Sequence, residues 1–354
     1  DMRQNRIRLC IAVLTVIGIG CLIMGSGASE SDNQNEIYVG IACYDQGDLF
    51  ISNLIQCFKN ELNSQKGDSY DVMVTVRDAV GSQKTQNDQV KEMIDEGCNI
   101  LCINLVDRTD PSEIIDSAKE KNIPIIFFNR EPVAEDMMQW DKLYYVGAKA
   151  RQSGQMQGEI AADLILNDKS IDKNHDGKIQ YVVLEGEMGH QDAIVRTDSS
   201  VETILAKGIK MEKLSYEIAN WKRAQAQNRM EQLIRQYGNT IELVLSNNDD
   251  MALGALDSYR LMGYTKDNMP MMLGVDGMQE ALEAVKDGRL TGTVYNDKEG
   301  QAQVMAAIVF ASVSGKGLDG INFENLTEVY LPYQKVTIDN VDHYLETNEG
   351  NTTP

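Results

Sequence analysis

The stretch DKNHDGKIQ, which begins at Asp172, has the spacing of a calcium-binding loop over most of its length. Asp172, Asn174 and Asp176 stand at positions 1, 3 and 5 of the EF-hand pattern, and a glycine, Gly177, stands at the sharp turn of position 6. Position 12 of that pattern carries a bidentate Glu, but this chain has Val183 there. The stretch therefore predicts either an empty turn or a calcium site that a carboxylate from elsewhere completes.

A second set of polar residues follows the predicted strands, at the edge where open parallel sheets bind ligands. It combines carboxylates, amides, one histidine, one arginine and aromatic rings: Tyr44, Asp48, Phe50, Asn129, His190, Asp192, Arg196, Trp221, Asn248, Asp276 and Asn296. Any single Asp or Asn that opens a helix is usually an N-cap. Together, however, planar polar groups suit hydroxyls, which both donate and accept, and flat rings suit apolar C–H faces. The set predicts a sugar-binding site.

These residues are positioned by strands and helices that alternate from residue 37 onward. The apolar runs IYVGIAC, YDVMVTV, ILCINLV and IPIIFFN are separated by helical patterns, which predicts a parallel sheet covered on both faces. KLYYVGA, near residues 142–148, is predicted to start a second run that ends with LTGTVYN. Because one open sheet rarely carries so many strands, the predicted fold class is α/β with two doubly wound parallel-sheet domains. No glycine-rich phosphate loop follows any strand, which argues against a nucleotide enzyme.

Composition limits the function further. The 354 residues are enough for two domains with their own cores. A formal net charge of −21 argues against nucleic acid as a partner, because phosphate binding needs clustered Lys and Arg. Cys43, Cys57, Cys98 and Cys102 are expected to be buried free thiols rather than disulfides or zinc ligands. The chain is expected to act as a monomer.

The first residues have the pattern of an export signal. Three arginines precede the apolar run LCIAVLTVIGIGCLIMG, and the small, polar stretch SGASESDNQNE follows it. Cys21 lies where a lipid anchor could be attached, although Gly18 stands at the −3 position, where the usual lipoprotein pattern has Leu. Lipidation of Cys21, cleavage after Ala28 and an uncleaved anchor remain open alternatives.

Longer motifs make the sequence similar to a known family. FFNREP, YYVG, GHQDAIVR, NNDDMALGA, GVDG and GTVYND occur in this order. With them the chain resembles, from about residue 37 to 345, the bacterial D-galactose/D-glucose-binding proteins of sugar ABC transport and chemotaxis. The resemblance implies the type I periplasmic-binding-protein fold, whose two domains are joined by a three-crossing hinge. Gln191 departs from the family, in which a Pro is familiar at this position.

The resemblance also implies domain boundaries and residue roles. The boundaries are 1–36 for the signal or lipoprotein anchor and linker, 37–146 with 298–330 for the first domain, 149–295 with 331–346 for the second, and 347–354 for a tail. Every member of the polar set matches a sugar contact of the family, with Trp221 and Phe50 on opposite faces of the sugar and Asp48 toward its 4-hydroxyl. A structural Ca²⁺ would be held by Asp172, Asn174, Asp176, the main-chain carbonyl of Lys178, Gln180 and, as the missing carboxylate, Glu242.

The function that the resemblance implies is extracytoplasmic binding of D-galactose or D-glucose by hinge closure. The sugar would pass to the transmembrane permease subunits of an ABC importer, and a chemoreceptor is a further expected partner. A sugar sensor that feeds a histidine kinase remains an alternative. A sugar-responsive repressor would need a basic helix-turn-helix before residue 37, where the apolar segment stands. A glycosidase could use Asp48, Asp192 or Asp276 as a carboxyl pair, but no catalytic residue is predicted and the chain is not expected to be an enzyme.

Overall fold

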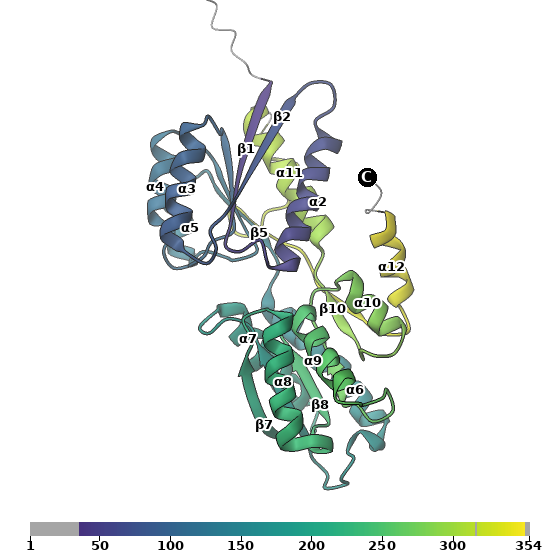
Figure 1. The fold of residues 1–354 in the computed structure, drawn as a ribbon. Helices are drawn as coiled ribbons and strands as arrows, with labels where there is room; N and C mark the ends of the chain where they lie inside the picture. The colour runs from purple at the N-terminus through teal and green to yellow at the C-terminus, as the bar shows by residue number, and fades with distance from the viewer. Residues whose placement is uncertain (1–34, 316, 351–354) are drawn as a thin grey trace, which may run out of the picture. The chain divides into compact units, whose positions relative to one another are not determined.

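The computed structural model describes residues 35–315 and 317–350 of the chain (Figure 1). The predicted export signal, Cys21 and the cleavage position after Ala28 lie outside the described residues. Among the described residues, no helix is both long enough and apolar enough to cross a membrane.

The first sheet has six strands in the order β11-β5-β4-β3-β1-β2 (Figure 1). Its strands are β1 (Glu36–Cys43), β2 (Asp71–Asp78), β3 (Ile100–Ile103), β4 (Ile125–Phe128), β5 (Leu143–Gly147) and β11 (Glu328–Tyr330). The pairs β1–β3, β3–β4, β4–β5 and β5–β11 are parallel. Because β1, β3, β4 and β5 are buried almost throughout, helices must cover both faces of this sheet.

Two layers of helices cover the first sheet. The helices are α2 (Leu49–Gln65), α3 (Gln83–Asp95), α4 (Ser112–Glu120), the one-turn α5 (Ala134–Met137) and α11 (Lys298–Ser314). Helix α2 packs beside α11, and their apolar side chains share one core with Ile41 and Phe128. Helices α3 and α4 form a second core with the opposite face, which includes Leu101 and Phe127. The sequence thus brings a helix from near residue 300 back onto the first sheet.

The second sheet has four parallel strands in the order β7-β6-β8-β9. Its strands are β6 (Ile179–Glu185), β7 (Met211–Ile218), β8 (Leu243–Ser246) and β9 (Met271–Leu273). The helices beside it are α6 (Ala150–Asn167), α7 (Gln191–Ala206), α8 (Arg223–Tyr237), α9 (Asp249–Leu261) and α10 (Gln279–Lys286). Helices α6 and α7 pack together, as do α8 and α9. Two short 3-10 helices are η1 (Lys169–Ile171) and η2 (Gly238–Thr240).

A small antiparallel ladder completes the described chain. Strand β10 (Thr293–Tyr295) pairs with β12 (Gln334–Val336), and helix α12 (Val341–Gly350) packs against α10. The chain therefore passes between the two groups of elements three times: between β5 and α6, between β10 and α11, and between β11 and β12. The predicted α/β class with two parallel sheets is confirmed, whereas the residue boundaries of the domains stay predictions.

The strand pattern alone assigned one element to the wrong sheet, although the boundary at residue 146 that the resemblance implies keeps most of it in the first domain. KLYYVGA was predicted to start the second run, but β5 pairs with β4 in the first sheet, with Ile125 opposite Leu143. The reason is that a strand buried on both faces is a continuous apolar run. Its sequence pattern is the same whether it is the last strand of one sheet or the first strand of the next. The prediction of free thiols is confirmed for all four cysteines in this part of the chain, Cys43, Cys57, Cys98 and Cys102. Three of them are buried, and Cys57 is partly exposed.

Candidate functional site

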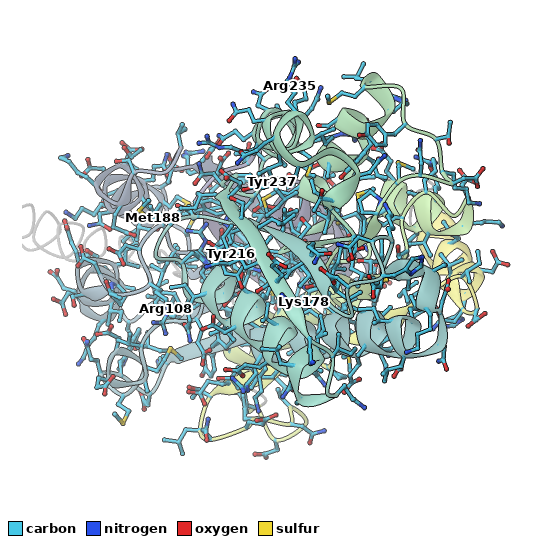
Figure 2. All side chains as sticks on the ribbon, turned by 90° about the horizontal axis from the view of Figure 1, so that it is seen from below. Arg108, Lys178, Met188, Tyr216, Arg235 and Tyr237 are labelled. Atoms are coloured by element: carbon cyan, nitrogen blue, oxygen red, sulfur yellow. The ribbon has the colours of Figure 1, made fainter. Side chains whose placement is uncertain are left out.

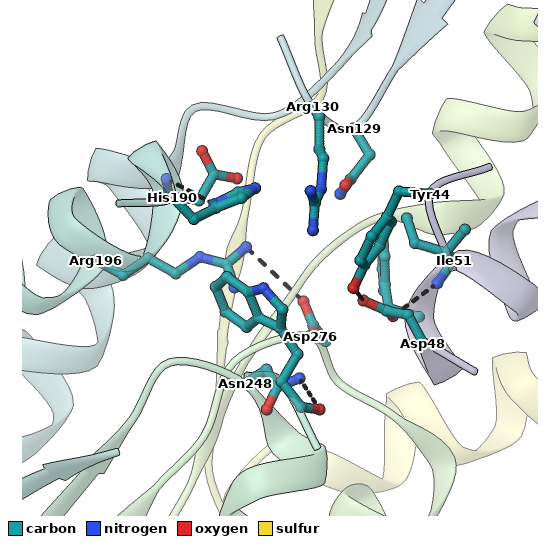
Figure 3. A pocket seen from close by; sticks show the side chains of 12 residues that line it. Tyr44, Asp48, Ile51, Asn129, Arg130, His190, Arg196, Asn248 and Asp276 are labelled. Atoms are coloured by element: carbon teal, nitrogen blue, oxygen red, sulfur yellow. Dashed lines mark hydrogen bonds and ion pairs between the residues drawn. The ribbon is translucent and has the colours of Figure 1, made fainter. Parts of the chain in front are cut away.

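A polar cleft lies at the carboxyl ends of strands from both sheets (Figure 3). Its twelve lining residues are Tyr44, Asp48, Phe50, Ile51, Asn129, Arg130, His190, Asp192, Arg196, Trp221, Asn248 and Asp276. Ten of the eleven residues of the predicted polar set are therefore brought together in one place. The eleventh, Asn296, lies behind the lining, where its Nδ2 donates to Asp276 Oδ1 at 3.3 Å. Sequence reasoning missed Ile51 and Arg130.

Asp48 is fixed at the start of α2. It is the N-cap of that helix, and its Oδ1 accepts from the backbone N–H of Ile51 at 3.1 Å. Its Oδ2 accepts from the Tyr44 hydroxyl at 2.6 Å. Because a carboxylate oxygen has more than one acceptor position, both oxygens can still receive a ligand hydroxyl. The N-cap role and a ligand role are thus compatible in one side chain.

Asn129 presents a donor to the cleft. It has a positive φ of 61°, a conformation that non-glycine residues hold only where the surroundings enforce it. The fully buried Asn104 enforces it in part, since its Nδ2 donates to the Phe128 carbonyl at 3.2 Å and to Asn129 Oδ1 at 3.4 Å. With its oxygen engaged, Asn129 has its Nδ2 group left for a ligand acceptor.

Arg130 forms part of the same wall, although its side chain is only 4% exposed. The guanidinium lies over the ring of Tyr44, with Cζ 3.4 Å from the ring centroid. Its Nη1 donates to the Val106 carbonyl at 3.0 Å, and its Nη2 donates to Glu187 Oε2 at 2.6 Å. The only sequence signal for this residue was its place in FFNREP, directly after Asn129.

Trp221 supplies a flat apolar surface on the side of the second sheet. It is 7% exposed and has a positive φ of 64°. A Cβ at Gly186 would lie 2.1 Å from the indole ring, so only glycine permits this close approach. The His190 ring meets the indole edge-on, with centroids 5.3 Å apart. On the side of the first sheet, Phe50 is the second buried aromatic residue of the lining.

His190 is held as a neutral donor. Burial, together with the nearby guanidinium groups of Arg130 and Arg196, lowers its pKa to about 2. Its Nδ1 accepts from the backbone N–H of Asp192 at 3.2 Å. A neutral imidazole carries one proton, so the proton resides on Nε2. His190 can therefore donate one hydrogen bond from Nε2 to a ligand oxygen.

Arg196 has a buried donor that a ligand could use. It is 5% exposed, and its Nη1 and Nη2 donate to the Asn247 carbonyl at 2.8 Å and to the Tyr333 hydroxyl at 3.1 Å. Its Nε is also buried but has no hydrogen-bond partner within the described part of the chain. Since an unpaired buried donor costs free energy of about 1–3 kcal/mol, a ligand that supplies an acceptor here would be stabilised.

Asp276 and Asp192, on the side of the second sheet, lie in an environment that disfavours a charged carboxylate. Desolvation raises the pKa of Asp276 to about 7, although Arg196, with Nη2 4.0 Å from Asp276 Oδ1, acts to lower it. Desolvation likewise raises the pKa of Asp192, against the lowering effect of Arg196. Both groups lack enough donors to stabilise a full negative charge. Hydroxyl donors from a ligand would supply what is missing.

The amides of this wall are oriented by buried neighbours. Asn248 caps α9, with its Oδ1 accepting from the Met251 N–H at 2.9 Å. Asn296 Oδ1 accepts from Gln301 Nε2 at 2.8 Å, which turns the Asn296 Nδ2 group toward Asp276. The site is thus assembled from the ends of many strands, each with a local hydrogen bond that sets its orientation.

The predicted calcium loop lies at the opposite, amino-terminal end of the second sheet; Figure 2 views the molecule from below, with Lys178 labelled. The structure brings Glu242 to it as predicted: Glu242 is 1% exposed, and its oxygens accept from the N–H groups of Lys173 at 2.6 Å and Gln180 at 3.1 Å. The side-chain amides of Asn174 and Gln180 both donate to Asp176 Oδ2, at 3.3 and 2.8 Å.

The donor set of this loop suits calcium by its chemistry. Three carboxylates, two side-chain amides and one carbonyl would give six oxygen ligands, the number at which calcium coordination begins. Rotating the two amides would direct their oxygens rather than their nitrogens toward Asp176. In the present geometry, no group of three His, Cys, Asp or Glu residues within the described ranges is close enough to hold an ion.

Comparisons with known proteins agree on one family. Residues 39–317 match the periplasmic binding protein domain family. The D-galactose/methyl-galactoside binding periplasmic protein MglB of Haemophilus influenzae is 35% identical over 338 residues, which cover 95% of this chain and 99% of that protein. The chain belongs to the periplasmic binding protein family. Membership confirms the predicted resemblance and places this protein among solute-binding proteins, which are not enzymes.

More distant relatives of this periplasmic binding protein differ in their named ligands. The xylitol-binding protein of Mycolicibacterium smegmatis is 28% identical over 95% of this chain and 87% of its own length. A solved ABC transporter solute binding protein from Bacillus halodurans, with bound myo-inositol, has a TM-score of 0.73 at 26% identity and covers 89% of this chain and 99% of its own. The family indicates a location outside the cytoplasmic membrane.

Proposed function

We propose that this protein binds one aldohexopyranose, D-glucose or D-galactose, in the cleft between its two sheets. The observation that carries the proposal is the combination in one cleft of planar polar groups with two buried aromatic residues, Trp221 and Phe50. A pyranose presents hydroxyls around its rim and C–H groups on its two faces. Rings on the faces and bidentate groups around the rim match this shape.

The orientations of the lining groups indicate how the hydroxyls would be shared. His190 Nε2, Asn129 Nδ2 and Arg196 Nε can donate, as derived above from the partners that their other atoms already have. Asp48, Asp192 and Asp276 can accept. Because each hydroxyl both donates and accepts, alternating donors and acceptors around the ring would satisfy all of them. Asp48 is proposed to face the 4-hydroxyl, the position at which glucose and galactose differ.

The proposed mechanism is closure of the cleft around the sugar, without chemistry. Six of the twelve lining residues belong to the first sheet and its loops and six to the second, so the full set of contacts forms only when both sides meet the ligand. A ligand with greater affinity for the closed form shifts the equilibrium toward it. We propose that the closed, loaded form delivers the sugar to the transmembrane subunits of an ABC importer, and that a chemoreceptor is a second partner. A sensor that feeds a histidine kinase is the alternative role for the same closure.

The ligand is tested by calorimetry on the purified protein with a panel of sugars and polyols. D-glucose and D-galactose are expected to bind best and within about tenfold of one another, or ~1.4 kcal/mol, because a carboxylate accepts from either orientation of the 4-hydroxyl. The panel includes ribose, maltose, xylitol and myo-inositol, of which the last two come from the relatives. Tightest binding of any of these four would contradict the proposed hexose ligand.

We further propose that Ca²⁺ stabilises the second domain through Asp172, Asn174, Asp176, the Lys178 carbonyl, Gln180 and Glu242. Support comes from the buried Glu242 carboxylate, which the fold brings next to a loop about seventy residues earlier in the chain. A ligand that binds only the folded state adds RT ln(1 + [L]/Kd), so calcium at 100 times its Kd adds about 2.7 kcal/mol.

Chelation tests this proposal. It should lower the melting temperature while sugar affinity changes much less, because the loop and the cleft lie at opposite ends of the sheet. Glu212→Gln is a matched control, since Glu212 accepts from Gln180 Nε2 at 3.2 Å without being a proposed ligand. That variant should keep the response to chelator. An unchanged melting temperature, with no calcium binding by calorimetry, would mean that the stretch is an ordinary turn.

A further inference from the structure

Two ion pairs cross the cleft beside the proposed sugar site. Arg130 Nη2 lies 2.6 Å from Glu187 Oε2, and Lys222 Nζ lies 2.5 Å from Asp45 Oδ2. Asp45 and Arg130 follow strands β1 and β4 of the first sheet, whereas Glu187 and Lys222 follow β6 and β7 of the second. Each pair therefore joins loops from different sheets.

Each pair is anchored on the side of the first sheet. The Arg130 guanidinium is held by the Tyr44 ring and the Val106 carbonyl. Its orientation therefore does not depend on the ion pair with Glu187. Asp45 Oδ1 accepts from the Gly47 N–H at 2.7 Å, which leaves Oδ2 for Lys222. Burial alone would raise the pKa of Asp45, but the hydrogen bond from Lys222 lowers it overall. These side chains are preorganised, which reduces the entropy lost when a pair forms.

The four charged residues share their loops with proposed sugar contacts. Asp45 directly follows Tyr44, Arg130 follows Asn129, and Lys222 follows Trp221. Glu187 begins the turn that leads to His190, and its backbone carbonyl accepts from the His190 N–H at 3.0 Å. A loop that moves to meet the sugar therefore also moves one member of an ion pair toward its partner.

The polarity of the two pairs is opposite. In one pair the first side carries the cation, Arg130, and in the other it carries the anion, Asp45. Because each side presents one charge of each sign, the two sides attract in only one relative arrangement, and others place like charges together. The pairs can therefore define the geometry of closure as well as stabilise it.

We propose that Arg130–Glu187 and Asp45–Lys222 are latches that stabilise the closed, sugar-bound form, with these four residues acting as positioning residues. This inference rests on the proposed function, because closure is taken to follow sugar binding. A hexose is uncharged, so salt acts on its affinity through the protein's own charges. The latches form after the sugar has entered, and they therefore slow its dissociation while leaving its association rate nearly unchanged.

The test is a charge-swap cycle on Asp45–Lys222, the pair that does not line the cleft. Sugar dissociation is followed by stopped-flow tryptophan fluorescence at saturating calcium. Asp45→Lys and Lys222→Asp should each speed dissociation by about tenfold, because two like charges then face one another across the cleft. The double variant restores an ion pair of reversed polarity and should return the rate to within about threefold of the wild type.

A matched control pair lies within one side of the molecule. Lys91 and Glu113 join α3 to α4, and both side chains are more exposed than those of Asp45 and Lys222. Swapping their charges should leave the dissociation rate unchanged. For the other latch, Glu187→Gln should speed sugar dissociation by about threefold to fivefold. Raising NaCl from 20 to 500 mM should speed dissociation from the wild type by a similar factor. The same change in salt should have much less effect on an Asp45→Asn/Glu187→Gln variant, which lacks both ion pairs.

The outcomes separate this inference from the proposed function. If the wild type binds no hexose, the proposed function fails before the latches are tested. If the wild type binds a hexose but the two single swaps dissociate at the wild-type rate, the latches are refuted while the proposed function stands. The latches would also be refuted if the single swaps changed the dissociation rate and the double variant did not return it toward the wild-type value. The effect would then come from the individual side chains rather than from the ion pair.

Discussion

Asp276 makes the affinity of the site dependent on pH. Desolvation is the main cause that raises its pKa to about 7, and the Asp48 and Asp192 carboxylates contribute to the rise. Arg196 and the hydrogen bond from Asn296 act in the opposite direction, and the buried Asp249 faces it from the start of α9. A sugar hydroxyl that donates to the Asp276 carboxylate favours its ionised form, so sugar binding should lower the pKa of this group.

The sign and size of the effect follow from proton linkage. Since the bound state favours the ionised carboxylate, affinity is full above about pH 7 and is lost as the pH falls through that value. With a pKa of about 7, Asp276 is about 90% ionised at pH 8 and about 10% ionised at pH 6. If only the ionised form binds, the Kd should rise about tenfold between these values, equivalent to ~1.4 kcal/mol.

Calorimetry measures this directly. Titrations with D-glucose at pH 6, 7 and 8, each in two buffers of different ionisation enthalpy, give both the Kd and the number of protons released. Release should be greatest near pH 6 to 7 and small at pH 8. His190 does not contribute in this range, because its pKa is about 2. Asp276→Asn should bind weakly at every pH without the dependence. A Kd that is constant from pH 6 to 8, with no proton release, would refute the reasoning.

Other substitutions test the remaining assignments. Trp221→Ala should weaken sugar binding by roughly 2–4 kcal/mol, the range of a binding hot spot, because it removes a buried ring from the cleft; wild-type affinity by calorimetry would refute the stacking role. Glu242→Gln should lower the melting temperature in calcium to the value that chelator gives for the wild type, because it removes the carboxylate proposed for position 12. A variant that still gains stability on addition of calcium would show that Glu242 is not a ligand.

Much of the fold could be predicted from the sequence, because most of its strands are short apolar runs that alternate with helical patterns. The polar residues after those runs could be placed at the carboxyl edges of the sheets by topology alone, and Tyr44 and Asp48 from the first sheet do lie in one cleft with Trp221 from the second. The strand pattern alone placed β5 in the second run, because burial on both faces hides which sheet a strand joins. The boundary at residue 146 that the resemblance implies keeps most of this strand in the first domain. Strands β11 and β12 were not predicted, because each has only three residues and, unlike the equally short β10, neither stands in one of the predicted apolar runs.

Arg130 shows a different limit of sequence reasoning. An arginine after a strand is usually a solvated surface charge, and its place after Asn129 in FFNREP does not indicate that it is buried. Its burial depends on the Tyr44 ring and the Val106 carbonyl, which come from two other strands, and its ion pair depends on Glu187 from the second sheet. Contacts between distant segments of this kind have no periodic signature, so only the folded chain reveals them.

The balance of charge in the cleft explains why a neutral polyol is the ligand class that fits. Asp192 and Asp276 already lie where charge is disfavoured, as their raised pKa values indicate. A ligand carboxylate would add a further negative group to the three that line the cleft. The two arginines could not compensate it fully, because Arg130 is paired with Glu187 and Arg196 is bonded to Asn247 and Tyr333. A buried, unpaired charge costs more than the hydrogen bonds return. Hydroxyls avoid this cost and still supply the donors that both carboxylates lack, as well as the acceptor that Arg196 Nε lacks.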